Sequence, residues 1–207
     1  MSLSGWSTAN FLRLGSAPIT APPFTCAAWV YLTANVLSGD ILFIGQSSGA
    51  TNTNTFRLLA GSTAVALANG GVATSAALPL NTWTHVAGVW ASSTSRSVYV
   101  NGTGKVTNTT SATPGSIDRT SIGKRDNAAN DGGLAGNFAE WGLWNAALDD
   151  AEIAALGAGI PPINVRPQSL ISYLPMIRDT QDLKGLGFSL TGSVTAADHC
   201  RIYGVAA

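Results

Sequence analysis

The chain has 207 residues, of which 45% are hydrophobic and only 11% charged, and its eleven basic and eleven acidic residues cancel. A neutral chain does not attract nucleic-acid phosphates or an anionic membrane over long range, so we expect neither as a partner. No apolar run approaches the roughly 18 residues of a transmembrane helix. The first residues lack the basic and apolar regions of a Sec signal peptide, so we expect no Sec export.

Short alternations of apolar and polar residues, separated by Gly, Pro, Asn and Ser, predict β-strands along most of the chain. In chain order these are Phe24–Leu32, Asp40–Gly45, Thr55–Leu59, Ala64–Ala68, Val72–Ala77, Trp83–Trp90, Arg96–Val100, Lys105–Thr109, Thr120–Gly123 and Asn137–Trp144. Asn101-Gly102 predicts a tight hairpin turn, because both residues tolerate a positive φ. With no long helix between strands, the sheets should be antiparallel.

One short helix is predicted at Asp150–Leu156. Asp149 suits the N-cap, and Glu152 completes a capping box with it. We expect Gly157 to supply the left-handed residue that ends the helix, with Pro161 preventing continuation.

The C-terminal part of the chain predicts two further strands, Leu170–Leu174 and Phe188–Thr195. No low-complexity linker precedes them, so we expect residues 165–207 to dock on the sandwich formed by residues 1–164. The sequence as a whole predicts an all-β fold with two packed antiparallel sheets and one short helix.

Three segments, in this order, resemble a known superfamily. They are Phe24–Val30 (FTCAAWV), Trp83–Trp90 (WTHVAGVW) leading into Val98–Gly102 (VYVNG), and Gly136–Leu148 (GNFAEWGLWNAAL). Over roughly residues 6–160 the pattern resembles the laminin-G-like or pentraxin-like branch of the concanavalin A-like lectin/glucanase superfamily. The resemblance implies a jelly-roll sandwich, the class that the strand pattern also predicts.

Some members of that superfamily are glucanases, whose catalytic carboxylates lie on one strand as Glu-x-Asp-x-x-Glu. This chain has only two glutamates. Glu140 lies on a predicted strand, but the residues two and four positions further on are Gly142 and Trp144. Glu152 is explained as part of the helix cap. We therefore expect no catalytic residues and no enzymatic activity, since glycosidases need paired carboxylates.

A Gly-bounded loop contains Asp126, Asn127, Asn130 and Asp131. Hard cations prefer several oxygen ligands, and the resemblance implies calcium at loop carboxylates in many members. Asp126, Asn127 and Asp131 are therefore a candidate calcium site. The alternative is a polar loop in which these side chains make their own turns. No other cofactor is expected.

Six tryptophans raise the question of sugar stacking. Five lie in apolar strand contexts and are expected in the core: Trp29, Trp83, Trp90, Trp141 and Trp144. We expect Trp6, in a polar segment, to be the least buried. Carbohydrate binding therefore rests on the resemblance alone.

The resemblance implies that His85 is a packed, hydrogen-bonded residue of the sheet. Cys26 and Cys200 stand in apolar or strand-like surroundings, where they are either two buried thiols or a disulfide between the first and last strands.

Two functional hypotheses remain. Leu170–Met176 (LISYLPM) followed by Thr195–His199 (TAADH) resembles the tails of such domains in bacteriophage and prophage structural proteins. The first hypothesis is a non-catalytic decoration protein of the virion surface, assembled in the host cytoplasm. It would contact capsid or tail proteins, with host-surface glycans as further partners. A surface with so few charges loses water easily, so we expect a homo-oligomer or a lattice-bound subunit. The alternative is a carbohydrate-binding module of a bacterial surface protein.

Overall fold

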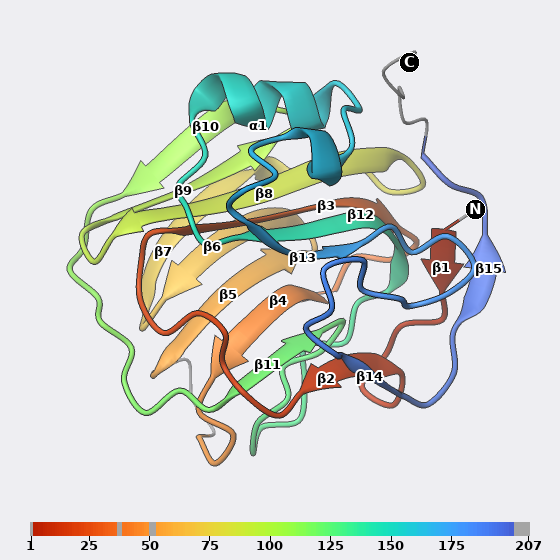
Figure 1. The fold of residues 1–207 in the computed structure, drawn as a ribbon, viewed down its shortest axis with the longest axis horizontal. Helices are drawn as coiled ribbons and strands as arrows, with labels where there is room; N and C mark the ends of the chain where they lie inside the picture. The colour runs from red at the N-terminus through yellow and green to blue at the C-terminus, as the bar shows by residue number, and fades with distance from the viewer. Residues whose placement is uncertain (1, 37–38, 50–52, 201–207) are drawn as a thin grey trace.

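The computed structural model describes residues 2–36, 39–49 and 53–200, and these form two antiparallel sheets packed face to face (Figure 1). Sheet A contains β1 (Ser2–Ser4), β3 (Phe24–Leu32), β8 (Trp83–Ser92), β9 (Ser95–Val100), β10 (Thr103–Asn108), β12 (Gly136–Trp144), β13 (Leu170–Leu174) and β15 (Thr195–Ala197). Sheet B contains β2 (Phe11–Leu14), β4 (Gly39–Gly45), β5 (Thr55–Ala60), β6 (Thr63–Ala68), β7 (Gly71–Ala77), β11 (Arg119–Ile122) and β14 (Ser189–Thr191). The predicted antiparallel jelly-roll sandwich is confirmed.

The strand order explains how distant segments meet. Sheet A runs β10-β9-β8-β3-β12-β1-β15, with β13 also pairing with β12, and sheet B runs β14-β2-β11-β4-β5-β6-β7. Residues 165–200 contribute to both sheets, because β13 pairs with β12, β14 with β2, and β15 with β1. The single strand predicted at Phe188–Thr195 is therefore wrong. The chain has a positive φ at Gly192 and supplies one short strand to each sheet.

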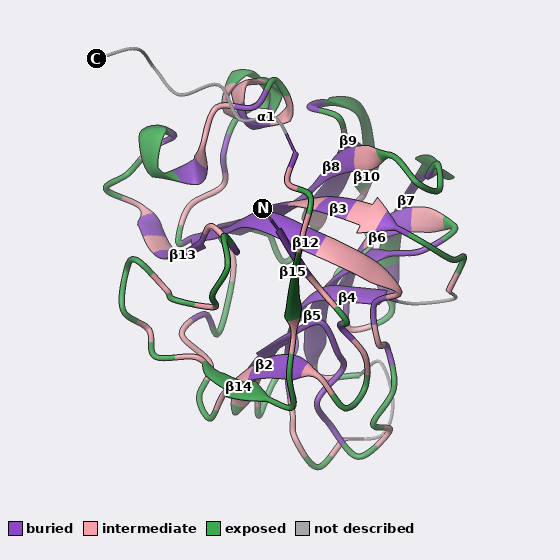
Figure 2. Ribbon diagram, turned by 90° about the vertical axis from the view of Figure 1, so that its right-hand side faces the viewer, coloured by how far each residue is buried: buried purple, intermediate pink, exposed green. Residues whose placement is uncertain are grey.

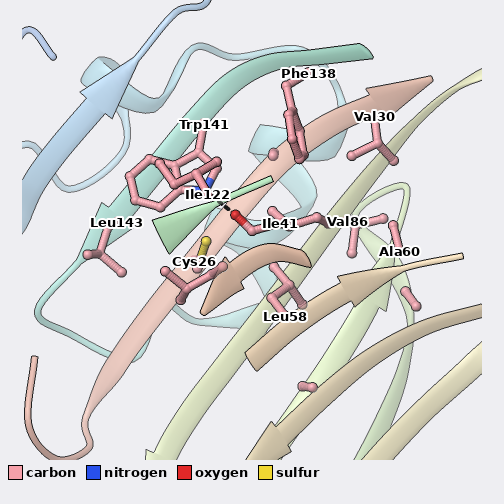
Figure 3. Close-up of a cluster of buried hydrophobic side chains, with 14 of the residues drawn as sticks. Cys26, Val30, Ile41, Leu58, Ala60, Val86, Ile122, Phe138, Trp141 and Leu143 are labelled. Carbon is pink, nitrogen blue, oxygen red and sulfur yellow. Dashed lines mark hydrogen bonds between the residues drawn. The ribbon is translucent and has the colours of Figure 1, made fainter. Parts of the chain in front are cut away.

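The core lies between the inner faces of the two sheets (Figure 3). Trp141 extends from β12 to β4, where its indole Nε1 donates a 2.9 Å hydrogen bond to the Ile41 carbonyl. Trp90 stacks on Phe24 at a centroid distance of 4.5 Å. Burying such aromatic side chains stabilises the fold by about 1.5–3 kcal/mol each, and both indoles have the hydrogen-bond partner that burial requires.

Trp6 is not the least buried tryptophan. Its side chain is only 4% exposed and packs edge-to-face against Phe138 at 5.1 Å. The indole Nε1 donates to the Leu3 carbonyl at 2.9 Å. The sequence did not predict this burial, because the residues around Trp6 are polar. The flanking strands β1 and β2 are also too short to show alternation.

The α1 helix (Asp150–Gly157) lies over sheet A on the side away from sheet B (Figure 1). The predicted capping box is confirmed: Glu152 N donates to Asp149 Oδ1 at 2.9 Å, and Asp149 N donates to Glu152 Oε2 at 2.8 Å. Gly157 does not end the helix in a left-handed conformation, because that residue is Gly159, with φ 94°. Pro162–Asn164 then forms a short 3₁₀ turn.

Gly157 instead allows close contact with the β9–β10 hairpin. A Cβ at this position would lie 2.5 Å from the Cα of Gly102. The predicted Asn101-Gly102 turn is confirmed, with φ values of 50° and 73°. Hairpin and helix therefore fit together only because both contact residues are glycines.

The buried segments are concentrated between the sheets and beneath α1 (Figure 2). Cys26 lies on the inner face of β3 and Cys200 follows β15; both are buried free thiols, so the structure supports the first of the two cysteine alternatives. No helix in the described part of the chain has the length and apolarity needed to cross a membrane.

Candidate functional site

Three aromatic side chains lie together on the outer face of sheet A, the face that points away from sheet B. They are Trp29 and Tyr31 on β3 and Trp83 on β8, and each is partly exposed. Tyr31 lies directly opposite Trp83, and their ring centroids are 5.7 Å apart. We call these three residues the aromatic platform. The expectation that Trp29 and Trp83 belong to the core is wrong, because their strands place Ala28, Val30 and Val86 on the inner face instead.

His85 lies beside the platform, opposite Trp29, with 5.5 Å between the ring centroids. The imidazole is 1% exposed, and burial lowers its pKa to about 3, so the ring is neutral at pH 7. It is packed in the sheet as expected. However, its Nδ1 atom has no hydrogen-bond partner among the described residues. Burying a ring nitrogen without a hydrogen-bond partner costs free energy of folding.

Glu140 occupies a β-bulge in β12 at the edge of the platform. Ala139 pairs with Trp29 and Gly142 with Ala27, so β12 has one residue more than β3 over this stretch. The extra residue is Glu140, whose φ is 53°. A left-handed conformation at a non-glycine residue costs of order 1–3 kcal/mol, and such residues and bulges are common at functional sites.

The Glu140 carboxylate is buried but has two partners. Tyr173 Oη donates to it at 2.5 Å, and His199 Nε2 lies 3.4 Å away. Burial and the Glu140 charge raise the pKa of Tyr173, so its hydroxyl stays protonated. Burial alone would lower the pKa of His199, but the Glu140 carboxylate outweighs it and raises that pKa. Tyr173 and His199 thus hold the Glu140 carboxylate in place at the bulge.

Cys200 lies beside this group, with its Sγ atom 3.6 Å from His199 Nδ1. A cysteine that contacts a histidine, which in turn contacts a glutamate, is the arrangement of a catalytic nucleophile with its general base. Burial and the Glu140 charge, however, raise the pKa of Cys200 to about 12. The thiol therefore stays protonated at neutral pH and is a poor nucleophile.

A groove of about 610 Å³ lies between the start of α1 and strands β8, β9 and β10. Its polar groups are bonded to one another: Tyr99 Oη and Lys105 Nζ donate to Asp150 Oδ1 at 2.7 and 2.9 Å. Tyr99 is only 3% exposed. The groove offers hydroxyl groups but no open aromatic face.

The predicted calcium residues lie in the loop after β11, and Asp126 is surrounded by cations. Arg13 forms a bidentate pair with it at 2.6 and 2.7 Å, Arg119 lies at 3.3 Å and Lys124 at 4.0 Å. Burial alone would raise the pKa of Asp126, but the Arg13 hydrogen bonds and the surrounding charges lower it.

Asp131 is paired with the Arg125 guanidinium, whereas Asp126 is paired with Arg13, so the two carboxylates do not share a partner. Asn127 makes a turn of its own, with Oδ1 accepting from Ala129 N at 3.0 Å. Within residues 2–36, 39–49 and 53–200, no group of three or more His, Cys, Asp or Glu is placed to hold a metal ion. The calcium site stays a prediction, and the observed contacts are those of the alternative, a self-paired polar loop.

The fold and the sequence agree on a family. Residues 7–154 match the concanavalin A-like lectin/glucanases superfamily. The chain belongs to this superfamily. No curated protein matches the sequence.

Solved structures of the same superfamily fold resemble the chain at low sequence identity. A putative carbohydrate binding protein from Bacteroides ovatus has a TM-score of 0.70 at 16% identity, with 96% of this chain and 61% of that protein covered. This chain therefore spans about three fifths of the Bacteroides protein. A carbohydrate-binding module (CBM40) of the Ruminococcus gnavus IT-sialidase, bound to α2,3-sialyllactose, has a TM-score of 0.62 at 14% identity and coverage of 76% and 100%. The heptameric SAP-like pentraxin of Limulus polyphemus gives 0.62 at 16%, with coverage of 92% and 93%.

These likenesses establish the concanavalin A-like fold and no more. Sequence reasoning missed both the platform and the Glu140 group. One signal was present: Phe138, Trp141 and Leu143 are spaced three and then two residues apart. That break in period-two alternation indicates a bulge at Glu140.

Proposed function

We propose that the chain is a non-catalytic carbohydrate-binding module and that sugar stacks on the aromatic platform. The observation that carries this proposal is the side-by-side exposure of Trp29, Tyr31 and Trp83 on one face of sheet A. An aromatic face carries negative charge density and attracts the weakly positive C–H groups of a pyranose ring. A sheet holds such rings rigidly, so little conformational entropy is lost on binding.

Polar groups beside the platform would orient the sugar. Asn137 is in register with Tyr31 and points to the same outer face. The imidazole of His199 has its ring centroid 6.4 Å from that of Trp83, and the buried Glu140 carboxylate holds it beside the platform. A few fixed polar groups next to an apolar surface are what gives a binding site its specificity.

The comparisons favour this alternative over a virion decoration protein, since the similar structures include carbohydrate-binding domains. A glycosidase is disfavoured by the carboxylates. Glu140 is committed to Tyr173 and His199, and Glu152 to the helix cap and Arg166. Location on a virion, capsid or tail partners and a homo-oligomeric state stay predictions.

A glycan array followed by titration of the best ligand tests the proposal. Trp83→Ala should weaken binding about tenfold, the equivalent of 1.4 kcal/mol of lost stacking. Trp83→Phe keeps a ring and should recover part of the affinity. Val72→Ala, on the other sheet, removes an exposed apolar side chain and should change nothing. An empty array, or equal affinity of Trp83→Ala and the unchanged chain, would refute the proposal.

A further inference from the structure

The outer face of sheet B carries a group of cations that the proposed sugar site does not use. Arg57, Phe43, Ser121 and Arg13 form one lateral row across β5, β4, β11 and β2. The loop after β11 crosses this row, held by a 2.8 Å hydrogen bond from Ser121 Oγ to the Lys124 carbonyl. We call Arg13, Arg119, Lys124, Asp126 and Asn127 the basic cluster.

Positive charge is in excess in the basic cluster. Three cations, Arg13, Arg119 and Lys124, lie within 4.0 Å of one carboxylate, that of Asp126. The local charge is therefore +2 in a chain whose net charge is zero. Partly buried charges of one sign are screened weakly by salt, so this excess attracts an anion.

Hydrogen-bond donors are also in excess. Lys124 is buried, with a side chain 6% exposed, yet its ammonium has no hydrogen bond to a described residue. Its nearest partners are Asp126 at 4.0 Å and the Phe11 ring at 4.1 Å. Arg119 Nε and Asn127 Nδ2 are buried without an acceptor.

A buried donor without an acceptor costs free energy, and in this cluster Arg119 Nε and Asn127 Nδ2 are such donors. Asp126 does not serve them all: its oxygens accept from Arg13 and from Arg119 Nη1, whereas Lys124 Nζ remains 4.0 Å away. Burial also lowers the pKa of Lys124, and a nearby anion would counteract that effect.

We propose that the basic cluster binds a small oxyanion, namely a sulfate, phosphate or carboxylate group, with Lys124 and Arg119 as its principal donors. An oxyanion offers several acceptor oxygens and neutralises the excess charge at once. Arg13 and Arg119 have side chains 42% and 29% exposed and form the rim, whereas Lys124 forms the floor. The group comes either from a free ion or from an acidic saccharide.

Isothermal titration of the full chain with sodium sulfate tests the proposal, with sodium chloride at equal ionic strength as the reference. We expect saturable binding at one site. Arg119→Gln should weaken it about tenfold, the loss of one charge-assisted hydrogen bond. Lys184→Gln removes one exposed positive charge elsewhere and should leave binding unchanged. Galactose 6-sulfate and galactose form a second pair of probes: tighter binding of the sulfated sugar than of sulfate identifies a saccharide source, and equal binding a free ion.

Three results would overturn the proposal. They are no saturation by about 10 mM sulfate, equal binding by Arg119→Gln, or calcium binding that Asp126→Ala abolishes. Trp83→Ala should bind sulfate normally, so failure of the sugar platform and failure of the basic cluster are distinguishable.

Discussion

The Tyr173 hydroxyl on β13 donates a 2.5 Å hydrogen bond to the Glu140 carboxylate on the neighbouring strand β12. The bond depends on the bulge, because the extra residue in β12 places Glu140 between Ala139, which faces outward, and Trp141, which faces the core. One inserted residue thus brings a buried carboxylate to the edge of the aromatic platform.

Removing this hydroxyl should destabilise the domain. In Tyr173→Phe the buried Glu140 carboxylate loses its shortest hydrogen bond, so we expect a loss of about 2 kcal/mol in urea unfolding. Tyr99→Phe is the matched control, since Tyr99 also donates to a carboxylate, that of Asp150, whose side chain is 70% exposed. Its loss should stay below about 1 kcal/mol. Equal losses in the two variants would contradict the role assigned to Glu140.

His85 should make the fold sensitive to mild acid. Its folded pKa is lowered to about 3, so the unfolded chain binds a proton below its ordinary value of 6.5 and the folded chain does not. The stabilisation is present above pH 6.5 and is lost as the pH falls. By pH 5 the loss should reach about 2 kcal/mol. His85→Phe should flatten the difference between pH 7 and pH 5; an unchanged slope would show that the folded ring titrates normally.

His199 should have the opposite effect. Burial opposes its protonation, but Glu140 raises its folded pKa above 6.5. The stabilisation is therefore complete below the unfolded value and is lost as the pH rises through the raised folded value. The difference in free energy of unfolding between the wild-type chain and His199→Gln should shrink between pH 6 and pH 9. An advantage that grows with pH would reverse the assignment.

Gly157→Ala should destabilise the chain although alanine favours helix. At an ordinary helical position the change stabilises by about 1 kcal/mol. Here the new methyl group would meet Gly102 of the hairpin, and we expect a net loss of about 1–3 kcal/mol. Ala151→Gly, on the exposed face of α1, should lose only the ordinary 1 kcal/mol or so. Stabilisation by Gly157→Ala would mean that hairpin and helix are not in contact.

Chelation should change the melting temperature little. The Asp126 and Asp131 carboxylates are engaged by Arg13 and Arg125, and calcium stabilises a fold only where it occupies a site. The check is thermal unfolding in EDTA and in millimolar calcium. A large calcium-dependent shift that disappears in Asp126→Ala would establish the predicted metal site.

The sequence predicts the elements that depend on local chemistry. The capping box of Asp149 and Glu152 and the Asn101-Gly102 turn need only neighbouring residues, and both are confirmed. The short strands β1 and β2 were missed because three or four residues are stabilised by pairing with distant partners and not by their own pattern.

The site was less accessible to sequence reasoning. Alternation shows that Trp29 and Val30 point to opposite faces but not which face a second sheet covers. The partners of Glu140 come from 33 positions away for Tyr173, and from after β15 for His199. The loop at Asp126 shows its acidic residues in the sequence, whereas its pairing with Arg13, 113 positions away, depends on tertiary structure.

The pairing of β1 with β15 decides how the domain responds to a pulling force. Ser2 lies opposite Ala197 and Ser4 opposite Thr195, so both ends of the described chain leave this strand pair on the same side. A load applied through the two ends opens the pair like a zipper, one hydrogen-bonded rung after another, and does not shear all rungs together.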